Sequence, residues 1–166
     1  LILRKKFIST VILVGVTMFS ESIFAHGIIR WRPIDYIPRF KCKCGCGNYK
    51  MDRDFLDRFQ KVRAEWFKET GKDLVRSVSS GYRCNAHNRR VSRYASKIDG
   101  SGPHTKGKAV DVKVSGKDAK RLFKIARKYM SGIGLAQRSR RKKNRYIHMD
   151  TLTAAEAPRP TVWRYN

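Results

Sequence analysis

Acidic residues are scarce in this sequence of 166 residues. It carries 13 aspartates and glutamates against 38 lysines and arginines, so its formal net charge at pH 7 is +25. A positive charge of this size favours anionic partners, among them nucleic acid, phosphate-rich envelope polymers and acidic membrane surfaces. The densest basic run is RSRRKK at 138–143. Such a run is typical of a solvated loop or of a patch that binds these polymers.

A long apolar run is also missing. The longest is FISTVILVGVTMF at 7–19, which is 13 residues and short of the roughly 20 that span a bilayer. Three basic residues precede this run and the small residue Ala25 follows it, which is the layout of a secretory signal peptide. An uncleaved N-terminal membrane anchor and a buried apolar segment are the weaker alternatives.

The chain therefore divides into three predicted parts. We predict a signal peptide over 1–25, a linker over 26–40 and one folded domain over 41–166, in a protein exported to the periplasm or secreted. Cleavage would remove three bases and one acid and leave a net charge of +23. For an exported protein, anionic envelope polymers then outrank nucleic acid as partners of the basic surface, and we expect no nucleic acid.

Cysteines are few, and they fall in two places. Three lie close together in KCKCGCG, and the fourth follows Arg83: Cys42, Cys44, Cys46 and Cys84. An even number of cysteines in an exported chain favours disulfides. Four thiols also suit a structural zinc, although the C-x-C-x-C spacing is tighter than usual. Disulfides, a structural metal and free thiols all remain open.

Helical and strand patterns alternate without a βαβ rhythm. Apolar residues at helical spacing predict a helix over 51–71 that ends at Gly71, and a weaker helix over 88–96. A third helix is expected from the Ser115 cap to Ser131. Short apolar or alternating runs predict strands over 73–81, 108–114, 132–136 and 145–150. The mixture predicts an α+β domain with a mostly antiparallel sheet and flanking helices.

Three residues have the chemistry of a catalytic metal site. His104 lies in a Gly/Pro loop before a predicted strand, and Asp111 lies inside that strand. In RYIHMD, His148 and Asp150 share one face of a strand because successive side chains point to opposite faces. Two imidazoles, a carboxylate and an open position suit Zn²⁺, which lowers the pKa of bound water to about 7. Spacing alone is weak evidence for such a site.

The sequence motifs around these residues are more specific evidence than their spacing. SSGYRCNAHN, SGPHTKGKAVDV, GIGLA, YIHMDT and VWRY resemble, in this order, motifs of the zinc D-Ala-D-Ala peptidase family, which includes D,D-carboxypeptidases, murein endopeptidases and the Hedgehog fold. The resemblance spans roughly residues 38–165. It implies a Hedgehog-like fold and a zinc peptidase that cuts a peptide bond in the peptidoglycan stem or cross-link. A non-catalytic, zinc-stabilised module that binds the cell wall is the alternative.

The resemblance also implies roles for single residues. His104, Asp111 and His148 match the zinc ligands, and Arg83 matches an arginine that points to the substrate's carboxylate or polarised carbonyl. Many relatives carry a catalytic glutamate three residues before the last histidine, where this chain has Arg145. Asp150 is the expected substitute as general base. In an alternative alignment, with relatives whose strand carries His-x-His and binds the metal through the second histidine, Asp150 is the ligand and His148 is the acid or base.

Overall fold

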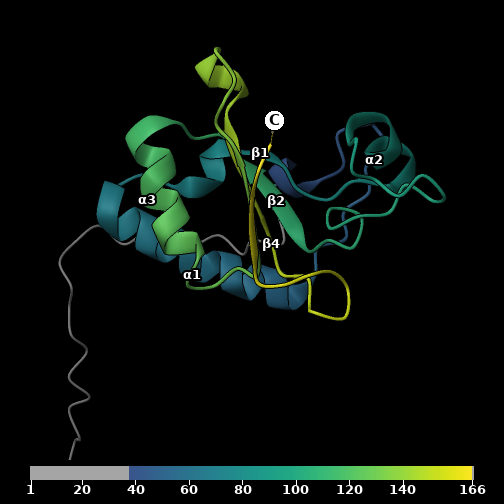
Figure 1. Cartoon of the computed structure of the whole chain (residues 1–166), viewed down its shortest axis with the longest axis horizontal. Coiled ribbons are helices and arrows are strands. Elements are labelled where there is room, and N and C mark those ends of the chain that lie inside the picture. Colours follow the sequence, from purple (N-terminus) through teal and green to yellow (C-terminus); the bar gives the residue numbers. More distant parts are fainter. Residues whose placement is uncertain (1–37, 166) are drawn as a thin grey trace, which may run out of the picture. The chain divides into compact units, whose positions relative to one another are not determined.

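The computed structural model describes residues 38–165 (Figure 1). The predicted signal peptide and most of the predicted linker lie outside these residues, so both stay predictions. Among the helices of the described part, none combines the length and apolar character needed to cross a membrane.

Helix α1 (Arg53–Thr70) confirms the first predicted helix. Asp52 caps its beginning, where Oδ1 accepts a hydrogen bond from the amide of Phe55 at 2.9 Å. Gly71 ends it in the left-handed conformation with φ of 67°, and its amide donates to the carbonyl of Phe67. Its apolar face is buried and includes Phe55, Phe59 and Trp66.

The other two helices differ from their predicted bounds. Helix α2 (Asn85–Val91) begins three residues before the predicted start, because the sulfur of Cys84 accepts a hydrogen bond from the amide of His87 and caps it. Helix α3 (Gly116–Ala126) follows Ser115, whose side chain makes no capping bond. It ends before the expected Ser131, because the amides of Lys128 and Tyr129 turn to carbonyls three residues back.

A five-stranded sheet forms the centre of the described region. Its strands in spatial order are β1 (Val78–Ser80), β2 (Ala109–Val112), β4 (Tyr146–Asp150), β3 (Gly132–Ala136) and β5 (Thr161–Arg164). Only the β3–β5 pair is parallel, so the sheet is mostly antiparallel and the α+β prediction is confirmed. The predicted strand over 73–81 begins as a 3-10 helix (Leu74–Ser77) and only its end is β1. Strand β5 was not among the predicted strands.

The two faces of the sheet have opposite characters. Val110, Val112, Ile147 and Met149 are fully buried in one apolar core with residues of α1 and α3. Burying an aliphatic side chain of this size contributes about 1.5–3 kcal/mol. The alternating residues between them, including Asp111 and His148, stand on the other face. In Figure 1, α3 lies to one side of the strands and α2 to the other.

Candidate active site

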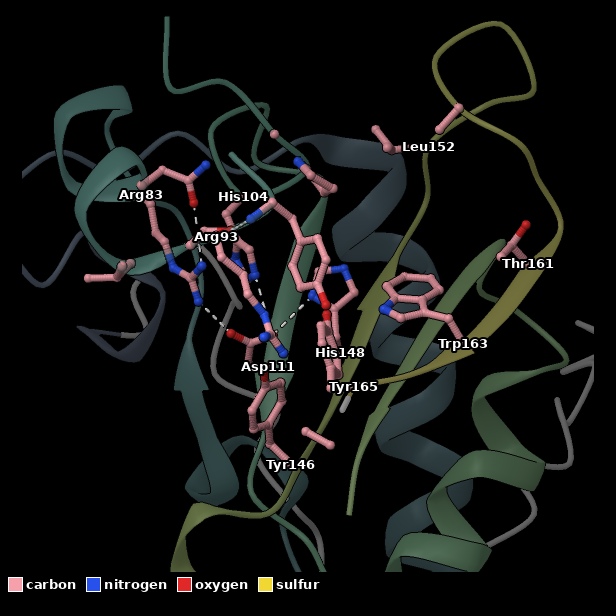
Figure 2. A pocket seen from close by; sticks show the side chains of 18 of the residues that line it. Arg83, Arg93, His104, Asp111, Tyr146, His148, Leu152, Thr161, Trp163 and Tyr165 are labelled. Carbon is pink, nitrogen blue, oxygen red and sulfur yellow. Dashed lines mark hydrogen bonds and ion pairs between the residues drawn. The ribbon is translucent and has the colours of Figure 1, made fainter. Parts of the chain in front are cut away.

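Sheet register brings Asp111 and His148 together. Strands β2 and β4 are antiparallel, and Asp111 is paired directly with His148. Side chains at opposed positions of antiparallel strands are neighbours. His104 reaches the same place from the loop before β2. The sequence prediction that these residues share one centre therefore has a structural basis in a single strand pair and one loop (Figure 2).

The possible ligand atoms of these three residues converge. Oδ1 of Asp111 lies 3.3 Å from Nε2 of His104 and 3.0 Å from Nδ1 of His148. One ligand atom from each residue can be chosen so that all lie within 4.8 Å of one another. The three residues are at least 92% buried, with exposed fractions of 4%, 8% and 4% for His104, Asp111 and His148. Two nitrogens and one carboxylate oxygen are a donor set that zinc prefers.

Neighbouring oxygens orient both imidazoles. Nδ1 of His104 lies 2.7 Å from the carbonyl oxygen of Gly81. A carbonyl only accepts, so this nitrogen donates and Nε2 keeps its lone pair for a metal. Nε2 of His148 lies 3.2 Å from Oδ2 of Asp150 and donates in the same way, which leaves Nδ1 directed toward Asp111. These two nitrogens lie 3.3 and 3.0 Å from Oδ1 of Asp111, so the residues present fit a zinc ion.

Arg83 closes the other side of Asp111. Its Nη2 donates to Oδ2 of Asp111 at 2.5 Å, and its Nε donates to the hydroxyl of Ser80 at 2.8 Å. Its Nη1 lies 3.4 Å from Oδ1 of Asn88. Its side chain is 13% exposed and lines the cavity over the three donors. Arg83 thus orients the carboxylate of Asp111 while it faces the cavity.

The buried charges shift one another's pKa. Burial raises the pKa of Asp111, but His104 and His148 outweigh this and hold it well below its usual range. Burial lowers the pKa of His104, which favours the neutral ring that a metal needs. Burial also lowers the pKa of His148, but Asp111 and Asp150 outweigh it and raise the pKa. A metal ion bound at His148 would therefore compete with a proton.

Asp150 is held from several directions. It is fully buried, and Arg159 donates to both its carboxylate oxygens, at 2.9 and 2.8 Å. Burial raises the pKa of Asp150, but hydrogen bonds from His148 and Arg159 outweigh this and lower it to about 2. A carboxylate so strongly paired is a weak base. These contacts favour an orienting role for Asp150, and the general-base role stays a prediction.

Glycines in β3 make room for this arrangement. Gly132 and Gly134 are paired with Asp150 and His148 across the sheet. A β-carbon at Gly132 would collide with the Asp150 carboxylate, and one at Gly134 would lie 2.7 Å from the rings of Trp163 and Tyr165. The alternating glycines of GIGLA therefore leave the side of β3 next to His148 and Asp150 free of side chains.

An open cavity of about 1030 Å³ lies over the site. One part of its wall is aromatic: the ring of His148 lies 5.4 Å from that of Trp163, which in turn contacts Tyr165. Another part is cationic and includes Arg83, Arg93, Arg138 and Arg159. The cavity is large enough for a short peptide and suits one that carries carboxylates.

Some site residues gave no sequence signal of their role. Arg159 stands between prolines in APRP and resembles any of the 38 basic residues. Its guanidinium also lies over the ring of Trp163, 5.3 Å from the centroid. Trp163 belongs to the VWRY motif, but its place beside His148 depends on the parallel pairing of β5 with β3.

The four cysteines also come together, away from these donors. All four are free, and one sulfur from each lies within 4.8 Å of the others. The structure thus contains two groups of metal-ligating side chains in its described part. We call them the His/Asp cluster (His104, Asp111, His148) and the cysteine cluster (Cys42, Cys44, Cys46, Cys84).

The His/Asp cluster, with an open cavity above two nitrogens and one oxygen, has the form of a catalytic rather than a structural zinc site. A family model described as Peptidase M15 matches residues 37–150, and the chain belongs to that family. This confirms the assignment to the zinc D-Ala-D-Ala peptidases, whose members are zinc-dependent. No curated protein and no solved structure matches the chain.

Proposed function

We propose that this protein is a zinc peptidase that hydrolyses a peptide bond in the peptidoglycan stem or cross-link, as a D,D-carboxypeptidase or a murein endopeptidase. The observation that carries the proposal is the His/Asp cluster on the floor of an open cavity with Arg83 beside it. Membership of the Peptidase M15 family supports peptidase chemistry. The choice of peptidoglycan as substrate rests on the sequence motifs that resemble those of the zinc D-Ala-D-Ala peptidases.

Each residue has a defined task in this proposal. His104, Asp111 and His148 would hold the zinc, and the Gly81 carbonyl and Asp150 would orient the two imidazoles. When bound, zinc supplies a Lewis acid that activates water and polarises the carbonyl under attack. Aromatic rings along the cavity would exclude water from one side of the bound peptide.

Arg83 would bind the substrate. A guanidinium carries five N–H donors, and the bonds to Ser80, Asn88 and Asp111 use one at each nitrogen. Two donors therefore remain for a substrate carboxylate or for the oxyanion that forms during attack. Because Arg83 is bonded to Asp111, these donors would lie next to the proposed metal ligands.

Digestion of purified peptidoglycan tests the proposal. Metal-loaded protein should release stem-peptide fragments, and mass analysis of the fragments identifies the bond that is cut. Chelated protein and the His104→Ala variant are the matched controls and should release none. If loaded protein binds peptidoglycan without cutting it, the cell-wall-binding alternative replaces the peptidase.

A further inference from the structure

We propose that the cysteine cluster binds a second, structural zinc ion, independently of the proposed peptidase function. The four cysteines come from two loops that are far apart in the sequence. Cys42, Cys44 and Cys46 belong to one loop, and Cys84 precedes α2. The chain has four cysteines in all, so the cluster uses every one of them.

A tight turn brings the first three sulfurs together. In an extended strand, Cys42 and Cys46 would be about 13 Å apart, which is too far for two ligands of one ion. Here the amide of Cys42 donates to the carbonyl of Asn48 and closes a loop. Gly45 and Gly47 adopt φ of 88° and 70°, conformations that strain other residues. This curvature overcomes the C-x-C-x-C spacing that counted against a metal in the sequence.

The distances between sulfurs fit a metal better than a disulfide. Sγ of Cys44 lies 3.4 Å from that of Cys42 and 3.7 Å from that of Cys84. Four thiolates around zinc at about 2.3 Å in tetrahedral geometry are about 3.8 Å apart. Sulfurs in a disulfide are about 2.05 Å apart. The cluster therefore has the dimensions of a four-sulfur zinc site.

Hydrogen-bond donors surround the sulfurs as expected for thiolates. The amide of Cys84 donates to Sγ of Cys42 at 3.3 Å, and the amide of His87 donates to Sγ of Cys84 at 3.4 Å. Nδ1 of His87 lies 3.2 Å from Sγ of Cys42. Zinc binding releases the four thiol protons and leaves a site with two negative charges. Such donors, in a chain with a large excess of basic residues, stabilise that charge.

The position of the cysteine cluster indicates which part of the chain a bound zinc would stabilise. It joins the loop after Phe40 to the segment that ends at Cys84, and the amide of Tyr82 already donates to the carbonyl of Phe40. Gly81 packs so closely that a β-carbon there would lie 2.6 Å from Cα of Phe40. The same short segment supplies the Gly81 carbonyl to His104 and the Arg83 guanidinium to Asp111. A zinc in the cysteine cluster thus holds the segment that orients His104 and Asp111 of the His/Asp cluster.

Metal content of the full chain tests the proposal. Protein prepared with zinc under reducing conditions should contain two zinc ions, measured by elemental analysis. His104→Ala should lose one, Cys42→Ser should lose the cysteine-bound zinc and bind the other more weakly, and the double variant should lose both. Two zinc ions retained in Cys42→Ser would overturn the proposal, and so would a disulfide within the cluster of metal-replete protein. Failure of the His/Asp cluster is distinguishable, since one zinc would then remain that is lost only in Cys42→Ser.

Cobalt in place of zinc gives a readout that does not depend on a variant folding. Cobalt bound by thiolates shows intense sulfur-to-metal charge-transfer absorption in the near ultraviolet, which nitrogen and oxygen ligands do not produce. Wild-type protein loaded with cobalt should show this absorption and lose it on titration with a mercurial thiol reagent. Its absence in fully loaded protein would overturn the proposal.

A matched pair of variants tests the ligand set. His87→Ala should retain two zinc ions, because His87 is assigned to a hydrogen bond with Cys42. Cys46→Ala should bind the second zinc at least tenfold more weakly. The reverse result would overturn the all-cysteine assignment.

Discussion

The two clusters of metal-ligating residues differ in what positions them. In the His/Asp cluster, Asp111 and His148 stand opposite each other on paired central strands, so the backbone hydrogen bonds of the sheet hold them at the required separation. The cysteine cluster lies between two loops, and its shape depends on Gly45 and Gly47. The His/Asp cluster would be in place before a metal arrives, whereas the zinc proposed for the cysteine cluster would hold two loops together.

Their donor atoms differ in the same sense. Two nitrogens and an oxygen under an open cavity leave room for water and a substrate, whereas four sulfurs complete the coordination of zinc. Arg83, which is bonded to Asp111 of the His/Asp cluster, is adjacent in sequence to Cys84 of the cysteine cluster. The comparison predicts that loss of metal from the His/Asp cluster would stop the proposed peptide hydrolysis and leave the fold intact. Loss of metal from the cysteine cluster would loosen the fold around the His/Asp cluster.

The largest effect is expected at His104. His104→Ala removes a metal ligand from a preformed site, so peptidoglycan cleavage should fall to the uncatalysed background. His104 is buried and bonded to the Gly81 carbonyl but lies outside the sheet, so the melting temperature should fall moderately while the fold is kept. Cleavage assays, zinc content and thermal melts check these points. Global unfolding of this variant would contradict the view that the sheet positions the site without metal.

A smaller effect is expected at the residue that joins the clusters. Loss of a hydrogen bond to a charged group costs about 1.5–3 kcal/mol, so Arg83→Ala should lower kcat/KM roughly 10–150-fold. Kinetics on a stem peptide with a free carboxylate and on an internal cross-link should be compared. A larger loss on the free carboxylate indicates a carboxypeptidase, and equal losses indicate an endopeptidase. Wild-type kinetics on both substrates would show that Arg83 has no role in binding the substrate or the transition state.

Asp150 sharpens the distinction between orientation and chemistry. Asparagine can still accept the hydrogen bond from His148 but cannot take a proton. If Asp150 orients the ligand, Asp150→Asn should weaken zinc affinity about tenfold, the lower limit for lost outer-sphere contacts, with kcat at saturating zinc nearly kept. If Asp150 is the general base, kcat should fall about 10²–10⁴-fold at unchanged zinc affinity. Zinc titration against a competing chelator and kinetics at saturating zinc separate the two, with Asp57→Asn as an exposed control.

The smallest effect is expected at the exposed basic loop beside the cavity. Replacing Arg140, Arg141 and Lys142 with alanine should raise KM for intact peptidoglycan a few-fold at low salt, because each screened surface charge contributes little. Turnover of a small, uncharged stem-peptide analogue should not change. KM values across a salt series check this. An equal loss on the small analogue would place the loop in the site itself.

Sequence patterns predicted those parts of the molecule that depend on local order. The helix with Phe55 and Trp66 on one face, and the alternation around Asp111 and His148, follow from the period of the chain. The bond between Arg159 and Asp150 could not be predicted, because it joins a strand to a proline-flanked loop that carries no periodic signal. The sequence left disulfides, a structural metal and free thiols open for the four cysteines, because the gathering of their sulfurs depends on the dihedral angles of two glycines and on packing against Gly81.

The glycines of β3 set a limit on how this protein can be stabilised. Glycine within a strand usually weakens it, so an engineer seeking a higher melting temperature would replace Gly132 and Gly134 with residues that favour strands. Here a single added methyl group would displace the Asp150 carboxylate or the Trp163 ring. The crowding would outweigh the gain in strand propensity, so packing and the geometry of the site both require glycine at these two positions.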